Sequence, residues 1–134
     1  MNALDYELRD DLKYTSSHEW VKLEDTLAII GITDYAQHQL GDIVFVELPD
    51  TGLVLEKGSN AAEIESVKAV GDLIMPLSGE IVEVNQSLSD SPEIINTSPY
   101  EEGWIIKIKI THNDELNDLL SHNDYKILVE SEEK

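Results

Sequence analysis

Short hydrophobic runs, separated by clusters of Gly, Pro, Asn and Asp, recur along most of the chain. A spacing of about 8–12 residues between turns is typical of proteins built from short β-strands. A first hairpin is expected from segments 20–23 and 27–32, and further strands from segments 43–48, 53–55, 61–67, 73–75, 81–84 and 104–110. This pattern favours a compact, mainly β sandwich or barrel.

One short helix is expected inside this β-rich region, over residues 33–40. Asp34 is followed three residues later by Gln37, which is the spacing of a capping box at the start of a helix. Gly41 stands where a helix-terminating glycine belongs, because glycine adopts the left-handed backbone conformation without steric cost.

The last part of the chain has a different pattern. Segment 113–130 places hydrophobic residues at helical spacing, and Ser121 with Asp124 is typical of the start of a second short helix. Segment 87–102 is polar and holds two prolines, so it is expected to be a loop.

The length of 134 residues indicates a single folded domain. We expect this domain over residues 13–134, with a core from about 14 to 110 and the helical segment at 113–130. Residues 1–12 are polar and acidic, and they are expected to form an N-terminal arm, either loose or as a short helix.

Charge and cysteine content narrow the possible functions. The chain has 9 Lys and Arg against 28 Asp and Glu, a net charge of −19, which argues against binding to nucleic acid or to anionic membranes. Basic protein partners suit such a surface, with association rates that fall as salt rises. The absence of cysteine excludes disulfides, thiolate nucleophiles and Cys-ligated metal clusters.

No hydrophobic run approaches the roughly 20 residues of a membrane span. Segment 1–11 resembles neither a secretory nor a mitochondrial leader, so a cytoplasmic location is expected. The four histidines, His18, His38, His112 and His122, match no metal-binding spacing and are expected at the surface. No motif indicates a self-contained enzyme.

Lys68 is the unusual basic residue, since no other Lys or Arg lies between Lys57 and Lys107. It stands between two strand-like runs, where a turn would favour Gly, Asn, Asp or Pro. Instead Val67 and Ala69 flank it. A turn that presents a lysine between small apolar neighbours suits recognition by another protein, while an ordinary exposed lysine is the alternative interpretation.

The sequence around Lys68 resembles the lipoyl-attachment segment of the glycine cleavage system H protein family. Other segments resemble signatures of the same family in the same order, over residues 14–120: SHEWV at 17–21, GITDYAQ at 31–37, LGDIVFVELP at 40–49, SGEIVEVN at 78–85 and GW at 103–104. Biotin carriers usually place Met on both sides of the lysine, and lipoyl domains of 2-oxoacid dehydrogenases usually place Asp before it. The flanks of Lys68 fit neither family as well.

The resemblance implies a fold and a cofactor. The fold would be a mainly β barrel-sandwich hybrid of the hammerhead, lipoyl-domain type, with a short internal helix and a C-terminal helix. Lipoate would be attached as an amide to Lys68, within an attachment motif formed by Glu65, Ser66, Val67 and Ala69.

The resemblance also implies a cleft that shelters the lipoyl arm. By their positions in the family motifs, Ser17, Glu19 and Asp72 are candidate cleft residues, and carboxylates there would favour a cationic amine on the arm. Glu63 and Glu65 are expected around the lysine hairpin, where they would help a lipoylating enzyme to find it.

The function implied is that of a non-catalytic carrier. It would shuttle an aminomethyl group from the glycine decarboxylase (P-protein) to the aminomethyltransferase (T-protein), and dihydrolipoamide dehydrogenase (L-protein) would then reoxidise it. A lipoate ligase or lipoyl transferase would load it. Two alternatives stay open: an H-like lipoyl donor or relay for other lipoyl enzymes, and an unmodified acidic interaction domain.

The sequence departs from the family pattern at two places. Gly71 stands where the family commonly has a small hydroxyl residue, and Gly52-Leu53 stands where it often has Gly-Asp. Trp20 and Trp104 are expected in the core rather than in contact with a ligand.

Overall fold

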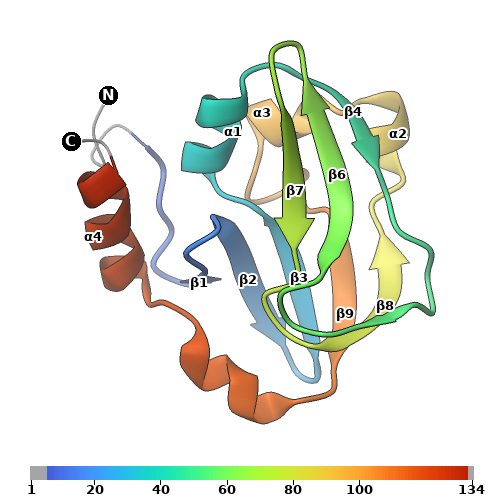
Figure 1. Cartoon of the computed structure of the whole chain (residues 1–134), viewed down its shortest axis with the longest axis vertical. Coiled ribbons are helices and arrows are strands. Elements are labelled where there is room, and N and C mark those ends of the chain that lie inside the picture. Colours follow the sequence, from blue (N-terminus) through green and yellow to red (C-terminus); the bar gives the residue numbers. More distant parts are fainter. Residues whose placement is uncertain (1–5, 133–134) are drawn as a thin grey trace.

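The computed structural model describes residues 6–132, which form two antiparallel β-sheets packed face to face (Figure 1). The six-stranded sheet has the order β1-β2-β3-β9-β8-β5, formed by Lys13–Tyr14, Glu19–Glu24, Leu27–Ile32, Ile106–Ile110, Gly79–Val84 and Val54–Leu55. The three-stranded sheet has the order β4-β6-β7, formed by Ile43–Glu47, Asn60–Ser66 and Val70–Ile74. The expected mainly β architecture is confirmed.

The lysine segment lies at the tip of the hairpin formed by β6 and β7. The strand expected at 73–75, which follows the lysine segment, begins earlier than predicted: β7 starts at Val70. Glu65 pairs with Val70, so only residues 66–69 remain for the turn. A tight turn, rather than a longer loop, therefore presents Lys68.

The expected internal helix is α1, Asp34–Leu40, but its start differs from the expectation. The N-cap is Thr33, whose hydroxyl accepts a hydrogen bond from the Ala36 amide at 3.1 Å. The Asp34 carboxylate instead accepts from the side chain of Gln37 at 2.8 Å. Gly41 ends the helix with φ of 85°, as expected.

Segment 87–102 is not simply a loop. It contains two short helices, α2 (Ser87–Asp90) and α3 (Ile94–Thr97), and it buries Leu88 and Ile95 completely. Those two side chains complete the hydrophobic core at one end of the sandwich, which explains why the segment is ordered into helical turns.

The chain ends in a 3-10 helix, η2 (Asn113–Asp118), and an α-helix, α4 (His122–Glu132). The expected restart at Ser121 is confirmed, because its hydroxyl accepts a hydrogen bond from the Asp124 amide at 3.1 Å. Figure 1 shows α4 standing beside the sandwich, next to α1 and the N-terminal segment.

Two hydrophobic clusters hold these elements together. The larger fills the space between the sheets and includes Ile30, Ile64 and Ile108. The second is aromatic and joins α1, β1 and α4; its members are Tyr6, Leu12, Tyr14, Trp20, Tyr35, Tyr100, Tyr125 and Val129. Trp20 is 1% exposed, as expected for a core residue.

The expected N-terminal arm falls partly outside the described residues, which begin at Tyr6. The ring of Tyr6 packs edge-on against the ring of Tyr35 in α1, with the two ring centroids 5.0 Å apart, and Leu12 is buried. The Tyr100 hydroxyl donates to the carbonyl of Glu7 at 2.5 Å. This part of the arm is thus packed against the domain. Within residues 6–132, no helix has the length and apolar character needed to cross a membrane.

Candidate functional site

The turn that carries Lys68 is held by one serine side chain. The hydroxyl of Ser66 accepts hydrogen bonds from the amides of Ala69 at 2.9 Å and Lys68 at 3.3 Å, and it donates to the carbonyl of Ala69 at 3.1 Å. Two backbone hydrogen bonds support the turn: the Ser66 amide donates to the carbonyl of Ala69 at 2.8 Å, and the Val67 amide donates to the carbonyl of Asp42 at 3.1 Å. The base of the lysine is therefore rigid, while its side chain is exposed.

The stem of Lys68 lies over the end of helix α1. A Cβ atom placed on Gly41 would lie only 3.2 Å from Cε of Lys68. Glycine at this position therefore serves two purposes: it permits the positive φ that ends the helix, and it leaves room for the lysine stem. The preceding residue, Leu40, faces a groove that begins here.

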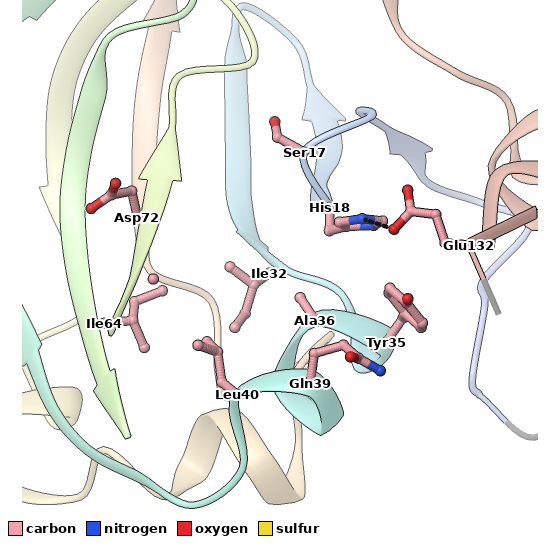
Figure 2. A pocket seen from close by; sticks show the side chains of 11 residues that line it. Ser17, His18, Ile32, Tyr35, Ala36, Gln39, Leu40, Ile64, Asp72 and Glu132 are labelled. Carbon is pink, nitrogen blue, oxygen red and sulfur yellow. Dashed lines mark hydrogen bonds and ion pairs between the residues drawn. The ribbon is translucent and has the colours of Figure 1, made fainter. Parts of the chain in front are cut away.

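This groove, which we call the α1–β7 groove, has a volume of about 330 Å³. It lies between α1, β7, the β1–β2 turn and the end of α4 (Figure 2). Its apolar lining comes from three different elements: Ile32, Ala36, Leu40 and Ile64. Gly71 also lines it, and a Cβ atom there would lie 3.1 Å from Cδ2 of Leu40.

Polar side chains line the groove around this apolar part. Ser17 and His18 come from the β1–β2 turn, Gln39 from α1, Asp72 from β7 and Glu132 from α4. Such a combination suits a ligand with an aliphatic stem and a polar or cationic end. Ser17 and Asp72, two of the three cleft residues expected from the sequence, are thus brought to one groove.

Glu19, the third expected cleft residue, is not among the residues that line the groove. It is 1% exposed and lies behind Ser17. Its Oε1 accepts hydrogen bonds from the hydroxyls of Ser17 and Thr15, both at 2.6 Å, and its Oε2 accepts from the amide of Ile74 at 3.3 Å. Burial raises the pKa of Glu19, and these hydrogen bonds act against the rise.

His18 contradicts the expectation that all four histidines lie at the surface. Its Nδ1 is 2.8 Å from the hydroxyl of Tyr125, and its Nε2 is 3.0 Å from Oε1 of Glu132. The backbone of His18 has a φ of 73°, a conformation uncommon for residues other than glycine. It allows Ser17 to line the groove while Glu19, two positions on, is buried.

Tyr125 connects this histidine to helix α1. Its hydroxyl is 2.7 Å from the hydroxyl of Thr33, the N-cap residue of α1, and its ring is stacked on Tyr14 with centroids 4.5 Å apart. Burial raises the pKa of the Tyr125 hydroxyl and therefore keeps it protonated. One wall of the groove is thus tied to the C-terminal helix through hydrogen bonds.

A sequence model of the family described as glycine cleavage H-protein matches residues 12–132. The chain belongs to this family. The H-protein family model covers the attachment turn, the groove and helix α4. It therefore spans every residue of the site described above.

Individual H proteins are similar to this chain over most of its length. The glycine cleavage system H protein of Staphylococcus epidermidis is 52% identical over 119 residues, which are 89% of this chain and 94% of that relative. The mitochondrial H protein of Pisum sativum is 53% identical over 124 residues, 92% of this chain and 75% of the relative. A crystal structure of an H protein from Mycobacterium marinum has a TM-score of 0.79 at 38% identity, covering 88% of this chain and 95% of that one.

Among the residues that line the groove of this H-protein family member, the sequence predicts only Ser17 and Asp72. His18 has no metal-binding spacing in the sequence, and its partners Tyr125 and Glu132 are 107 and 114 residues away in the chain. The adjacent motif residues Ser17 and Glu19 were the one local signal that could have pointed to it. In the described part of the chain, no group of three His, Cys, Asp or Glu residues has the arrangement of a metal site.

Proposed function

We propose that this chain is the lipoyl carrier of a glycine cleavage system, with the lipoyl group bound as an amide to Lys68. Membership of the H-protein family establishes the role of a carrier rather than a catalyst. The observation that carries the assignment to Lys68 is its position: an exposed lysine at the tip of a turn fixed by Ser66. A rigid base with a flexible four-carbon stem is what a mobile arm requires.

The residues near Lys68 fit a lipoyl group. The lysine stem lies beside Gly41, and the groove lined by the preceding residue, Leu40, offers both apolar and polar side chains. When bound, the lipoyl group would supply a disulfide: one sulfur would take the aminomethyl group from the glycine decarboxylase while the other became a thiol, and dihydrolipoamide dehydrogenase would reoxidise the dithiol left after transfer to the aminomethyltransferase. A lipoate ligase or lipoyl transferase completes the set of proposed partners.

The groove supplies shelter and charge. Apolar side chains such as Ile32 and Ile64 line part of the groove and would exclude water from a group bound against them. The hydroxyl of Ser17 would accept a hydrogen bond from an amine placed there, and the carboxylate of Asp72, on the strand that borders the groove, favours the cationic form of that amine. Glu19 holds Ser17 in position from behind.

The test is the mass of the intact protein after production in lipoate-supplied cells, followed by peptide mapping. We expect a lipoyl-sized increment on the peptide that contains Lys68, and no increment in the Lys68→Arg variant, which keeps the positive charge but cannot form the amide. An unmodified Lys68, in cells whose other lipoyl proteins are modified, would overturn the proposal.

We also propose a cytoplasmic location, which the bacterial relatives favour and cell fractionation would test.

A further inference from the structure

The attachment turn is held from outside its own hairpin by the connection between α1 and β4. The carbonyl of Asp42, in this connection, accepts a hydrogen bond from the Val67 amide at 3.1 Å. Strand β4 begins one residue later and pairs with β6 at Ile43 and Ser66, after which its register shifts. The position of Lys68 relative to the sandwich therefore depends on how this connection is held.

The side chain of Asn96 holds the connection on both sides of Asp42. Its Nδ2 donates to the carbonyl of Gly41 at 3.0 Å, and its Oδ1 accepts from the amide of Ile43 at 2.9 Å. The second hydrogen of Nδ2 is donated to Oε1 of Gln37, inside α1, at 2.8 Å. One amide group thus ties the end of α1 to the start of β4.

Asn96 is itself firmly placed, because its helix is anchored in the core. The preceding residue in α3, Ile95, is fully buried in the larger hydrophobic cluster. Figure 1 shows α3 beside α1. The acceptor in α1, Gln37, is only 5% exposed, and its own amide donates to Asp34 at 2.8 Å. The support of the attachment turn therefore originates in a helix that is distant from Lys68 in the sequence.

The spaces between α1 and the hairpin are narrow. A Cβ atom on Gly41 would lie 3.2 Å from Cε of Lys68, and one on Gly71 would lie 3.1 Å from Cδ2 of Leu40. Leu40 and Gly71 both line the α1–β7 groove. A movement of the end of α1 relative to the hairpin would therefore change both the course of the lysine stem and the width of the groove.

We propose that Asn96 is a positioning residue for the lipoyl arm: by fixing residues 41–43 it sets the attachment turn beside the groove, so that the arm can reach the apolar wall. The inference rests on the proposed function. Asn96 is not among the residues that line the groove, so it acts through the backbone of the α1–β4 connection. A turn that is held less firmly would leave the loaded end of the arm in water for more of the time.

The first measurement is amide hydrogen exchange in the full-length, unmodified chain. Asn96→Asp keeps the shape of the side chain but replaces the donating Nδ2 with an oxygen that faces two acceptors. We expect exchange at the Val67 amide to become at least about tenfold faster, because the support of Asp42 is lost. Exchange at Ile64, in the core of the same strand, gives the reference that reports overall loss of stability.

The matched control is Asn85→Asp. The Nδ2 of Asn85 also donates twice, to the carbonyls of Glu102 at 2.8 Å and Trp104 at 2.7 Å, and its Oδ1 accepts from the amide of Ser87 at 3.3 Å. The control therefore removes an equivalent set of hydrogen bonds away from the attachment turn. It should leave exchange at Val67 unchanged relative to the reference amide.

The second measurement follows the lipoylated chain after glycine and a purified bacterial glycine decarboxylase have loaded the arm and the decarboxylase has been removed. Water then attacks the aminomethyl carbon: the C–S bond breaks, the sulfur becomes a thiol, and formaldehyde and ammonium leave. The intact mass records this loss over time. We expect it to be about fivefold faster in Asn96→Asp than in the wild type, and within about twofold of the wild type in Asn85→Asp.

Asn96→Ala removes the same hydrogen bonds without adding a charge, so it serves as the second variant should Asn96→Asp fail to fold. It should show both effects, each smaller than in Asn96→Asp. Equal exchange at Val67 in the Asn96 and Asn85 variants would overturn the proposal, and so would a freed Val67 amide without faster loss from the arm. A wild-type chain that never carries lipoate would instead overturn the proposed function.

Discussion

Glu19 is a buried carboxylate whose protonation is linked to folding. Burial raises its pKa above the ordinary value of 4.5 in spite of three hydrogen bonds to its oxygens. An acid with a raised pKa in the folded state contributes stability that is fully present below its unfolded pKa. This contribution is lost as pH rises through the folded pKa.

The Glu19→Gln variant cannot titrate, so it should gain stability relative to the wild type as pH rises from about 4 to about 7. Urea unfolding at a series of pH values measures this difference. Thr15→Val, which removes a hydroxyl that donates to Glu19 at 2.6 Å, should push the pKa of Glu19 further upward and extend the same trend to higher pH. Parallel stability curves for Glu19→Gln and the wild type would contradict the assignment.

Some single residues were predictable because their role is local. Gly41 ends α1 as the sequence indicated, and Lys68 lies on a tight turn with its neighbour Ser66. The predicted N-cap of α1 was Asp34, whereas the N-cap in the structure is Thr33. The Asp34 carboxylate instead accepts hydrogen bonds from the side chain of Gln37 and from the amide of Glu7, and Glu7 is distant in sequence. His18 could not be placed for the same reason, since both of its partners belong to a helix at the other end of the chain.

Helix α4 packs on the domain through the buried side chains of Tyr125 and Val129, and the hydroxyl of Tyr125 also bonds to His18 and Thr33. Tyr125→Phe keeps the ring that stacks on Tyr14 but leaves Thr33 and His18 without this partner. We expect a loss of about 1–2 kcal/mol in the free energy of unfolding, with faster amide hydrogen exchange in α4 than in β6.

The exposed Ile127 on the same helix provides the control. It is 58% exposed, so Ile127→Ala should change the free energy of unfolding by less than about 0.5 kcal/mol. If hydrogen exchange in α4 were the same in Tyr125→Phe as in the wild type, the helix would be held by packing alone.

Strands were easier to predict than short helices. The β-branched and aromatic content of two short runs, with Glu24 and Asp25 between them, located the first hairpin, because a hairpin leaves its pattern within a short stretch of sequence. Four-residue helices such as α2 and α3 contain a single turn each, too short for a helical period to be seen. Their order comes instead from Leu88 and Ile95, which find their place only once the two sheets have closed.

At the scale of the whole molecule, the charge of −19 has two opposite consequences for the effect of salt. Raising the salt from about 0.01 M to about 0.15 M shortens the Debye length from about 30 Å to about 8 Å. Less self-repulsion should raise the melting temperature of the free chain, while weaker steering should slow its association with basic partner enzymes. Thermal unfolding and stopped-flow association measure the two effects, and association rates that stay flat across this range would contradict the second.

The hydrogen bond from Ile74 to Glu19 has a consequence for the behaviour of the protein at high concentration. Strand β7 is at the edge of its sheet, and an uncovered edge is a template on which another chain can add a strand and begin to aggregate. Glu19 occupies one outward amide of this edge, and Asp72 places a second carboxylate on the same strand. Together they oppose sheet extension by a second copy, so the strand that borders the groove stays available to the proposed lipoyl arm.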